Sequence, residues 1–181
     1  MKESIMFSFT IATNLVKQEY VQLFINNNPF GLHIHTPDGA TPKDGPSAGA
    51  AFTTAFISKI LNFKIKNDIA MTGEIEKHGN ITAIGGLDCK LLGAKRAGVK
   101  LVFVPKENEE DYKKIIDKNP DLCDNTFKII IVEHITTVLE YSLIDSDYIT
   151  SNNISQNNIT YSKTCDVLKF IDPVFYLFVV Y

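Results

Sequence analysis

The chain has 181 residues, of which 45% are hydrophobic and 22% are charged, a composition typical of a globular domain with a buried core. Its net charge of −3 provides no basic surface, so we expect no nucleic-acid partner. The longest apolar stretch, Pro173 to Tyr181, is too short to span a membrane, and no membrane partner is expected. Three cysteines without a Cys-x-x-Cys pair argue against a disulfide framework or a zinc site and favour a reducing compartment.

The first part of the chain predicts a helix followed by a strand. Apolar residues recur at three- and four-residue steps between Ser4 and Tyr20, which is the pattern of a helix. Residues 31–36 alternate and predict a strand that ends at a Pro-Asp-Gly turn. His33 and His35 would share one face of that strand. They could be two metal ligands, although no third ligand lies at a recognisable spacing, or hydrogen-bonded histidines beside a site.

Residues 41–50 join a turn to a helix. Pro42 and Gly45 cannot continue a regular element, whereas the small apolar residues after Ser47 predict a helix that continues to Asn62. Pro46 would suit the first helical position. The Ser47 hydroxyl could cap this helix, or it could be a nucleophile whose oxyanion is stabilised by the first amides of the helix. Both interpretations remain open at this point.

The middle of the chain alternates apolar strands with helices. This alternation predicts an α/β or α+β domain. We expect the last helix to be capped by Thr136 or Thr137. The expected strands cover residues 69–72, 81–84, 101–104 and 127–132, and the expected helices cover residues 87–97 and 136–143. Residues 107–117 are expected to form a charged surface helix or a turn.

Lys90 is placed early on one of these helices, beside leucines. Most lysines are solvated surface charges. A lysine in an apolar setting loses its proton more readily, and the positive end of its own helix acts in the same direction. Lys90 is therefore a candidate general base.

Several segments together closely resemble the proteolytic domain of the Lon proteases, which use a serine–lysine dyad. The likeness extends from Met1 to about Leu143, with the motifs in the family's order and spacing. The matching segments are Asp38 to Gly49, Met71-Thr72-Gly73-Glu74, Gly85 to Lys90, His33-Ile34-His35 and Pro105-Lys106-Glu107-Asn108.

This resemblance implies a fold and roles for individual residues. It implies an α+β, sandwich-like domain over residues 1–143, with a mixed sheet and packed helices. The remaining residues, 144–181, would form a divergent, partly disordered tail. Ser47 would be the nucleophile and Lys90 the base. Thr72 would hydrogen-bond the lysine, and Asp44 would cap or gate the site unless it is a plain turn residue. The supporting positions would be Thr72, Asp44, His33, His35 and Glu74.

The resemblance also implies a function: hydrolysis of peptide bonds in unfolded or damaged proteins. Lon enzymes join this domain to an upstream AAA+ ATPase module and form homo-oligomeric rings, hexamers in the family. No cofactor or metal is expected in this chain, which contains no Gly-rich phosphate loop. ATP and Mg would belong to the absent module. The expected location is the mitochondrial matrix or another reducing intracellular compartment.

Two departures from the family leave alternatives open. The opening strands of the domain are missing from this sequence, which we expect to leave a sheet edge unpaired and apolar surface bare. Asp88 stands before the lysine, where an acid is expected to raise the lysine pKa. One alternative is therefore a non-catalytic, truncated Lon remnant that acts as an assembly or binding module. Another is a metal hydrolase that uses His33 and His35, with chelator-sensitive activity.

Overall fold

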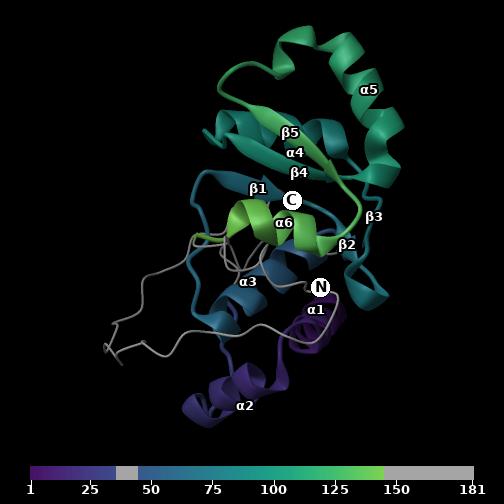
Figure 1. Cartoon of the computed structure of the whole chain (residues 1–181). Helices are drawn as coiled ribbons and strands as arrows, with labels where there is room; N and C mark the ends of the chain where they lie inside the picture. Colours follow the sequence, from purple (N-terminus) through teal and green to yellow (C-terminus); the bar gives the residue numbers. More distant parts are fainter. Residues whose placement is uncertain (36–44, 145–181) are drawn as a thin grey trace.

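The computed structural model describes residues 1–35 and 45–144 (Figure 1). No helix among these residues is long and apolar enough to cross a membrane. The helices are α1 (Lys2–Leu15), α2 (Gln18–Asn27), α3 (Gly49–Leu61), α4 (Leu87–Arg96), α5 (Glu109–Lys118) and α6 (Ile135–Ser142), and the 3-10 turns are η1 (Lys77–Gly79), η2 (Lys106–Asn108) and η3 (Pro120–Leu122). The strands are β1 (Ile69–Met71), β2 (Glu74–Ile75), β3 (Ile81–Thr82), β4 (Leu101–Pro105) and β5 (Lys128–Val132).

The described strands form a parallel sheet and a short antiparallel pair. The parallel sheet has the order β1-β4-β5, with Met71 opposite Phe103 and Phe103 opposite Ile130. The antiparallel pair consists of β2 and β3, with Glu74 opposite Thr82. Parallel and antiparallel strands with packed helices confirm the predicted α+β class and mixed strand arrangement, although the two kinds of pairing lie in separate sheets.

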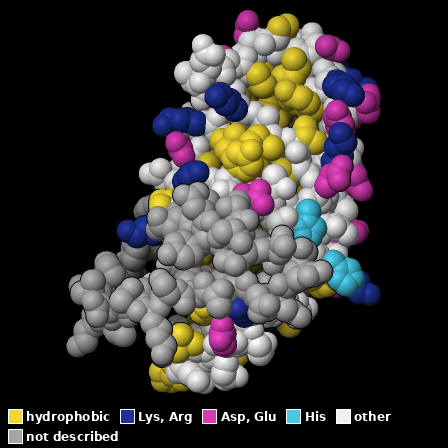
Figure 2. Space-filling model, in the orientation of Figure 1, with side chains coloured by type: hydrophobic (Ala, Val, Ile, Leu, Met, Phe, Trp, Pro, Cys, Tyr) yellow, Lys and Arg dark blue, Asp and Glu magenta, His cyan; other side chains and the backbone are white. Residues whose placement is uncertain are grey.

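Helices cover both faces of the parallel sheet. Met71 and Phe103 pack into one core with α1, α3 and α6, whereas Ala70, Val102 and Val104 pack into a second core with α4 and α5. The change of face between neighbouring residues follows from the two-residue period of a strand. Strands buried on both faces need continuous apolar sequence, which is what β4 has. Figure 2 shows hydrophobic side chains gathered on the face over β5, with charged side chains around its margin.

Helix α3 lies in the interior of the domain. Its residues are buried on nearly every side, and it packs against α1, where the Phe9 and Phe56 rings meet edge to face at 5.2 Å. Its first residue, Gly49, approaches the second sheet so closely that a Cβ atom there would lie 2.6 Å from the backbone nitrogen of Ile75. The helix ends before Asn62, which adopts the left-handed conformation of a C-cap. The predicted end of this helix is thus confirmed, and its entrance is held against β2.

Two predicted elements differ from the structure. The predicted helix over residues 4–20 is wrong in its extent, because Val16 is extended and divides it into α1 and α2. The break allows Val16, Val21 and Phe24 all to be buried. The strand predicted for residues 31–36 is wrong over the described residues 31–35, which form no strand. An alternating pattern needs a partner strand to become part of a sheet, and none lies beside these residues in the described part of the chain.

Apolar side chains line an open groove beside α1 and α2. The groove has a volume of about 1060 Å³ and is lined by Phe9, Phe24, Leu32 and Phe56 among others. Met6, on its margin, remains 63% exposed.

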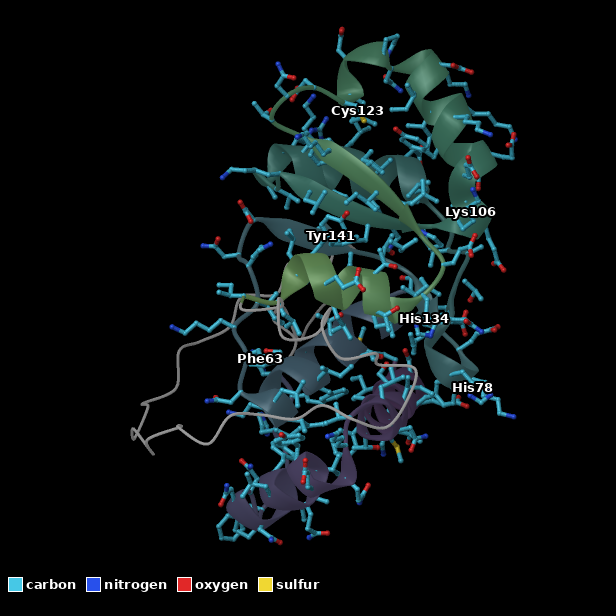
Figure 3. The ribbon with its side chains drawn as sticks, in the orientation of Figure 1. Phe63, His78, Lys106, Cys123, His134 and Tyr141 are labelled. Atoms are coloured by element: carbon cyan, nitrogen blue, oxygen red, sulfur yellow. The ribbon has the colours of Figure 1, made fainter. Side chains whose placement is uncertain are left out.

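The last helix, α6, is capped by a histidine. His134 Nδ1 accepts a hydrogen bond from the Thr136 backbone N–H and contacts its hydroxyl at 2.9 Å. The prediction of Thr136 or Thr137 as the cap is therefore wrong by two or three positions, because the imidazole nitrogen of His134 supplies the acceptor. His134 Nε2 lies 2.8 Å from the carbonyl oxygen of His78, a residue in the left-handed region with φ 69° (Figure 3). His134 thereby ties α6 to η1.

Replacing this histidine should destabilise the domain. We expect His134→Ala to lower the free energy of unfolding by about 1–3 kcal/mol, because it removes a helix cap and leaves the His78 carbonyl without its partner. Urea unfolding of both proteins measures the difference. His33→Ala is a matched control, because His33 is exposed and surface changes are usually worth less than about 0.5 kcal/mol. Equal losses in the two variants would contradict the capping role.

Candidate active site

The backbone of Ser47 is anchored to the end of strand β1. Its carbonyl oxygen accepts a hydrogen bond from the Gly73 N–H at 2.9 Å and one from the Thr72 hydroxyl at 3.3 Å. Thr72 itself is fixed to the neighbouring strand, because its N–H donates to the Phe103 carbonyl at 3.2 Å. The sheet therefore determines where the Ser47 side chain starts.

The Ser47 hydroxyl is not a helix cap. Helix α3 begins at Gly49, two residues later than Ser47; its N-cap is Ala48, and no side chain caps it. The sequence had suggested that Pro46 occupies the first helical position. That prediction is wrong, because Pro46 lies outside the helix. The tight turn in which the Gly49 N–H donates to the Pro46 carbonyl at 2.9 Å delays the helix start. The capping interpretation of Ser47 is wrong, and its hydroxyl is left to face another group.

That group is the amine of Lys90. Its Nζ donates to the Ser47 Oγ at 3.3 Å, across more than forty residues of sequence. Lys90 lies on α4, with only 9% of the residue exposed, next to the fully buried Leu91. Burial lowers the pKa of the Lys90 amine, because the charged form loses hydration.

The neighbouring acid does not reverse this shift. Asp88 lies on the exposed side of α4, and the cause of the Lys90 shift is burial, which lowers the pKa. The pKa of Lys90 is therefore lowered on balance, and Asp88 is not among the causes of the shift. A side chain two positions away on a helix points to a different face, so the carboxylate and the amine do not meet.

Thr72 supports the pair through the serine. Thr72 is almost fully buried, and its hydroxyl donates its single hydrogen bond to the Ser47 carbonyl. The sequence had suggested the lysine as its partner. A hydroxyl keeps two lone pairs after donating its proton, so Thr72 can still accept a hydrogen bond from a lysine ammonium.

Most amides at the start of α3 are already engaged. Besides the Gly49 turn, the Ala50 N–H donates to the Gly73 carbonyl at 3.0 Å. An oxyanion beside Ser47 would need donors that point at the reacting atom. The first helical amides were predicted for that role, but two of them, those of Gly49 and Ala50, already donate to other backbone groups.

Glu74 lines a pocket together with residues that precede Ser47 in the sequence. It begins β2, directly after Gly73. Together with Gly45 and Pro46, which precede Ser47, it lines a pocket of about 760 Å³ that reaches the start of α1. The role of Glu74 as a supporting residue therefore remains a prediction.

Within the described part of the chain, no hydrogen bond joins His33 or His35 to Ser47 or Lys90. His33 and His35 are exposed on the segment after α2, whose residues Leu32 and Ile34 line the apolar groove. No group of three or more potential metal ligands occurs in residues 1–35 and 45–144, so these histidines gain no third ligand there. Asp44 lies outside the described residues, and its role stays a prediction.

Sequence reasoning missed one residue of the site. Gly73 holds the Ser47 carbonyl with its N–H and the Ala50 N–H with its carbonyl. Its φ is 153°, and a Cβ atom there would lie 2.2 Å from a methyl group of Ile81. The signal was present in the sequence, since a glycine directly after a buried strand often marks a close approach of two backbones.

A family model described as Lon protease (S16) C-terminal proteolytic domain matches residues 1–145. The chain belongs to the Lon protease family. The resemblance predicted from its motifs is therefore confirmed, and the matched range contains both Ser47 and Lys90.

Individual Lon relatives support the same assignment. A Lon protease homolog of Acanthamoeba polyphaga mimivirus is 48% identical over 139 residues, which are 77% of this chain. The Lon proteases of Fervidobacterium nodosum and Clostridium acetobutylicum are 42% and 43% identical over 79% and 80% of the chain. The aligned regions make up only 14%, 17% and 18% of these three relatives. This Lon chain thus spans less than a fifth of the length of the relatives that it matches.

The lowered pKa of Lys90 can be measured directly. We expect its amine to titrate below the other lysines in a ¹³C NMR titration of isotopically labelled lysine Cε atoms, because burial disfavours the ammonium. The Lys90→Arg spectrum assigns the resonance. Titration of Lys90 together with the other lysines would contradict the burial seen in the structure.

Proposed function

We propose that this Lon-family chain is a serine peptidase that hydrolyses peptide bonds with Ser47 as nucleophile and Lys90 as general base. The observation that carries the proposal is the 3.3 Å contact between the Lys90 amine and the Ser47 hydroxyl. A serine hydroxyl is a weak nucleophile unless an adjacent base accepts its proton. Burial lowers the pKa of the Lys90 amine and so makes the neutral, basic form accessible.

The reaction would proceed in two stages. Neutral Lys90 accepts the Ser47 proton as Oγ bonds to the substrate carbonyl carbon, which gives a tetrahedral oxyanion. The Lys90 ammonium then returns the proton to the leaving amine as the C–N bond breaks, which leaves an acyl-enzyme. In the second stage a water molecule gives a proton to Lys90 and attacks the ester, and Ser47 regains its proton from Lys90 as the acid is released.

The surrounding backbone supplies the other requirements of this reaction. We assign the oxyanion to the amides of Ser47 and Ala48, because the next two amides are engaged elsewhere. Thr72 and Gly73 keep the Ser47 backbone from moving as its side chain changes charge. Donors that are fixed before the reaction stabilise the developing charge without reorganisation.

The substrates in this proposal are unfolded or damaged polypeptides, bound in extended form. The domain would work in a homo-oligomeric ring and depend on ATP when joined to an AAA+ module. The sequence contains no Gly-rich phosphate loop, so residues of this chain do not suit ATP and Mg, and no step of the hydrolysis passes through them. We place the protein in the mitochondrial matrix or another reducing intracellular compartment.

The alternative of a non-catalytic assembly module is not favoured. Burying a lysine amine costs stability. A module that only binds or assembles gains no activity from a lysine buried beside a serine to offset that cost. Here Lys90 is buried and directed at the Ser47 hydroxyl.

Casein cleavage by the purified chain tests the proposal. Ser47→Ala should reduce cleavage to background, and Lys90→Met should lower the rate about 10²- to 10⁴-fold, the usual contribution of a positioned base. Cleavage by the unaltered chain should rise with pH through the lowered pKa of Lys90, because only the neutral amine accepts the Ser47 proton. Lys128→Met, on an exposed lysine, controls for loss of charge. Equal residual rates in the unaltered chain and in Ser47→Ala would refute peptidase activity of this chain.

A further inference from the structure

Asn108 is a buried amide that makes no use of its position at a helix start. It is the N-cap of α5 and ends the turn η2, which begins at Lys106 (Figure 3). Asparagine is among the preferred N-cap residues, because its side-chain oxygen can accept from the first helical amides. In this chain the Asn108 side chain makes no such bond. The residue is nevertheless only 3% exposed, so its amide must have other partners.

Those partners are the two backbone groups of a single distant residue. The Asn108 Oδ1 accepts from the Ile84 N–H at 2.9 Å, and its Nδ2 donates to the Ile84 carbonyl at 3.0 Å. The Nδ2 also donates to the Asp111 carboxylate at 3.2 Å, which fixes the amide orientation. Next to this pair, the Glu107 carboxylate accepts from the Ala83 N–H at 2.8 Å. The turn η2 thus holds residues 83 and 84 as a neighbouring strand would.

The clamped segment leads directly into the helix of the base. Ile84 is followed by Gly85 and Gly86, and the Gly86 carbonyl accepts from the Lys90 N–H at 3.2 Å in the first turn of α4. A Cβ atom at either glycine would meet nothing within 4 Å, so packing does not restrain this pair. Glycine has wide conformational freedom. The last firm restraint before α4 is therefore the clamp on Ile84.

The clamp shares its support with the nucleophile. Asn108 follows β4 by three residues, and β4 also accepts the Thr72 N–H through the Phe103 carbonyl. Thr72 in turn holds the Ser47 carbonyl. One strand and the turn after it thus fix the serine through β1 and the lysine through Ile84.

We propose that Asn108 is a positioning residue for the serine–lysine pair, which holds α4 so that the Lys90 amine meets the Ser47 hydroxyl. The inference rests on the proposed peptidase function for its catalytic consequence. Reacting groups are sensitive to such placement, since a misplacement of about 1 Å can lower a rate about 100-fold.

Asn108→Ala in the full chain tests the proposal with two readouts. We expect kcat for a casein-derived peptide to fall roughly 10- to 100-fold with little change in KM, because substrate binding is left intact. Independently of cleavage, the NMR titration midpoint of the Lys90 Cε resonance should move up relative to the unaltered chain, because a displaced amine becomes more hydrated. Asn119→Ala is the matched control, since Asn119 lies at the other end of α5 and is exposed. It should change neither readout.

Further variants separate positioning from simple loss of folding. Asn108→Asp keeps the volume and the acceptor of the side chain but replaces the donor to the Ile84 carbonyl, so it should shift the Lys90 midpoint in the same direction. Thermal unfolding shows that each variant is folded at the assay temperature. An unchanged Lys90 midpoint and unchanged kcat in folded Asn108→Ala would overturn the proposal. A shifted midpoint in a chain that never cleaves would support the positioning and remove the peptidase function instead.

Discussion

The burial of the Lys90 amine beside the Ser47 hydroxyl is the constraint on which the site depends. A lysine has a flexible stem that can carry its charge to water, so the fold has to restrain it from both sides. Leu87 and Leu91 on α4 face the second core, and Ser47 meets the amine at 3.3 Å. The burial that disfavours the ammonium also lowers the pKa of the amine. The burial that holds the Lys90 amine beside Ser47 therefore also favours its neutral form.

The parallel sheet supplies the frame for this contact. Its strands β1 and β4 are neighbours in register, and each ends where a site segment begins: Thr72 and Gly73 after β1, η2 after β4. In sheets of this kind the functional groups gather where the parallel strands end. The interior helix α3 then needs only a short turn to present Ser47, because Gly49 allows its first turn to lie against β2.

The parts of this structure that sequence could predict are those with local causes. The apolar run at Leu101 forms β4, and the helix predicted to begin at Leu87 is α4, because hydrophobic period and glycine punctuation act within each segment. The motifs singled out Ser47 and Lys90, and the fold brings their side chains into contact. The break at Val16 was not predictable, since neither glycine nor proline marks it and the burial of α2 against α3 decides it. The segment at residues 31–35 likewise lacks the partner that its alternating pattern would need.

Positioning residues were harder to predict than reacting ones for a physical reason. A nucleophile and a base are recognisable by the chemistry of their own side chains, whereas Gly73 and Asn108 act through backbone groups that only the topology brings near. Both residues are connected to β4. Gly73 follows β1, which pairs with β4, and Asn108 lies in the turn that directly follows β4. If β4 moved as a whole, the residues that hold Ser47 and those that hold the segment before Lys90 would move together. The distance between the Ser47 hydroxyl and the Lys90 amine would then be preserved. A change at one of these residues alters that distance directly, so the accuracy of the pair depends on residues that take no part in the chemistry.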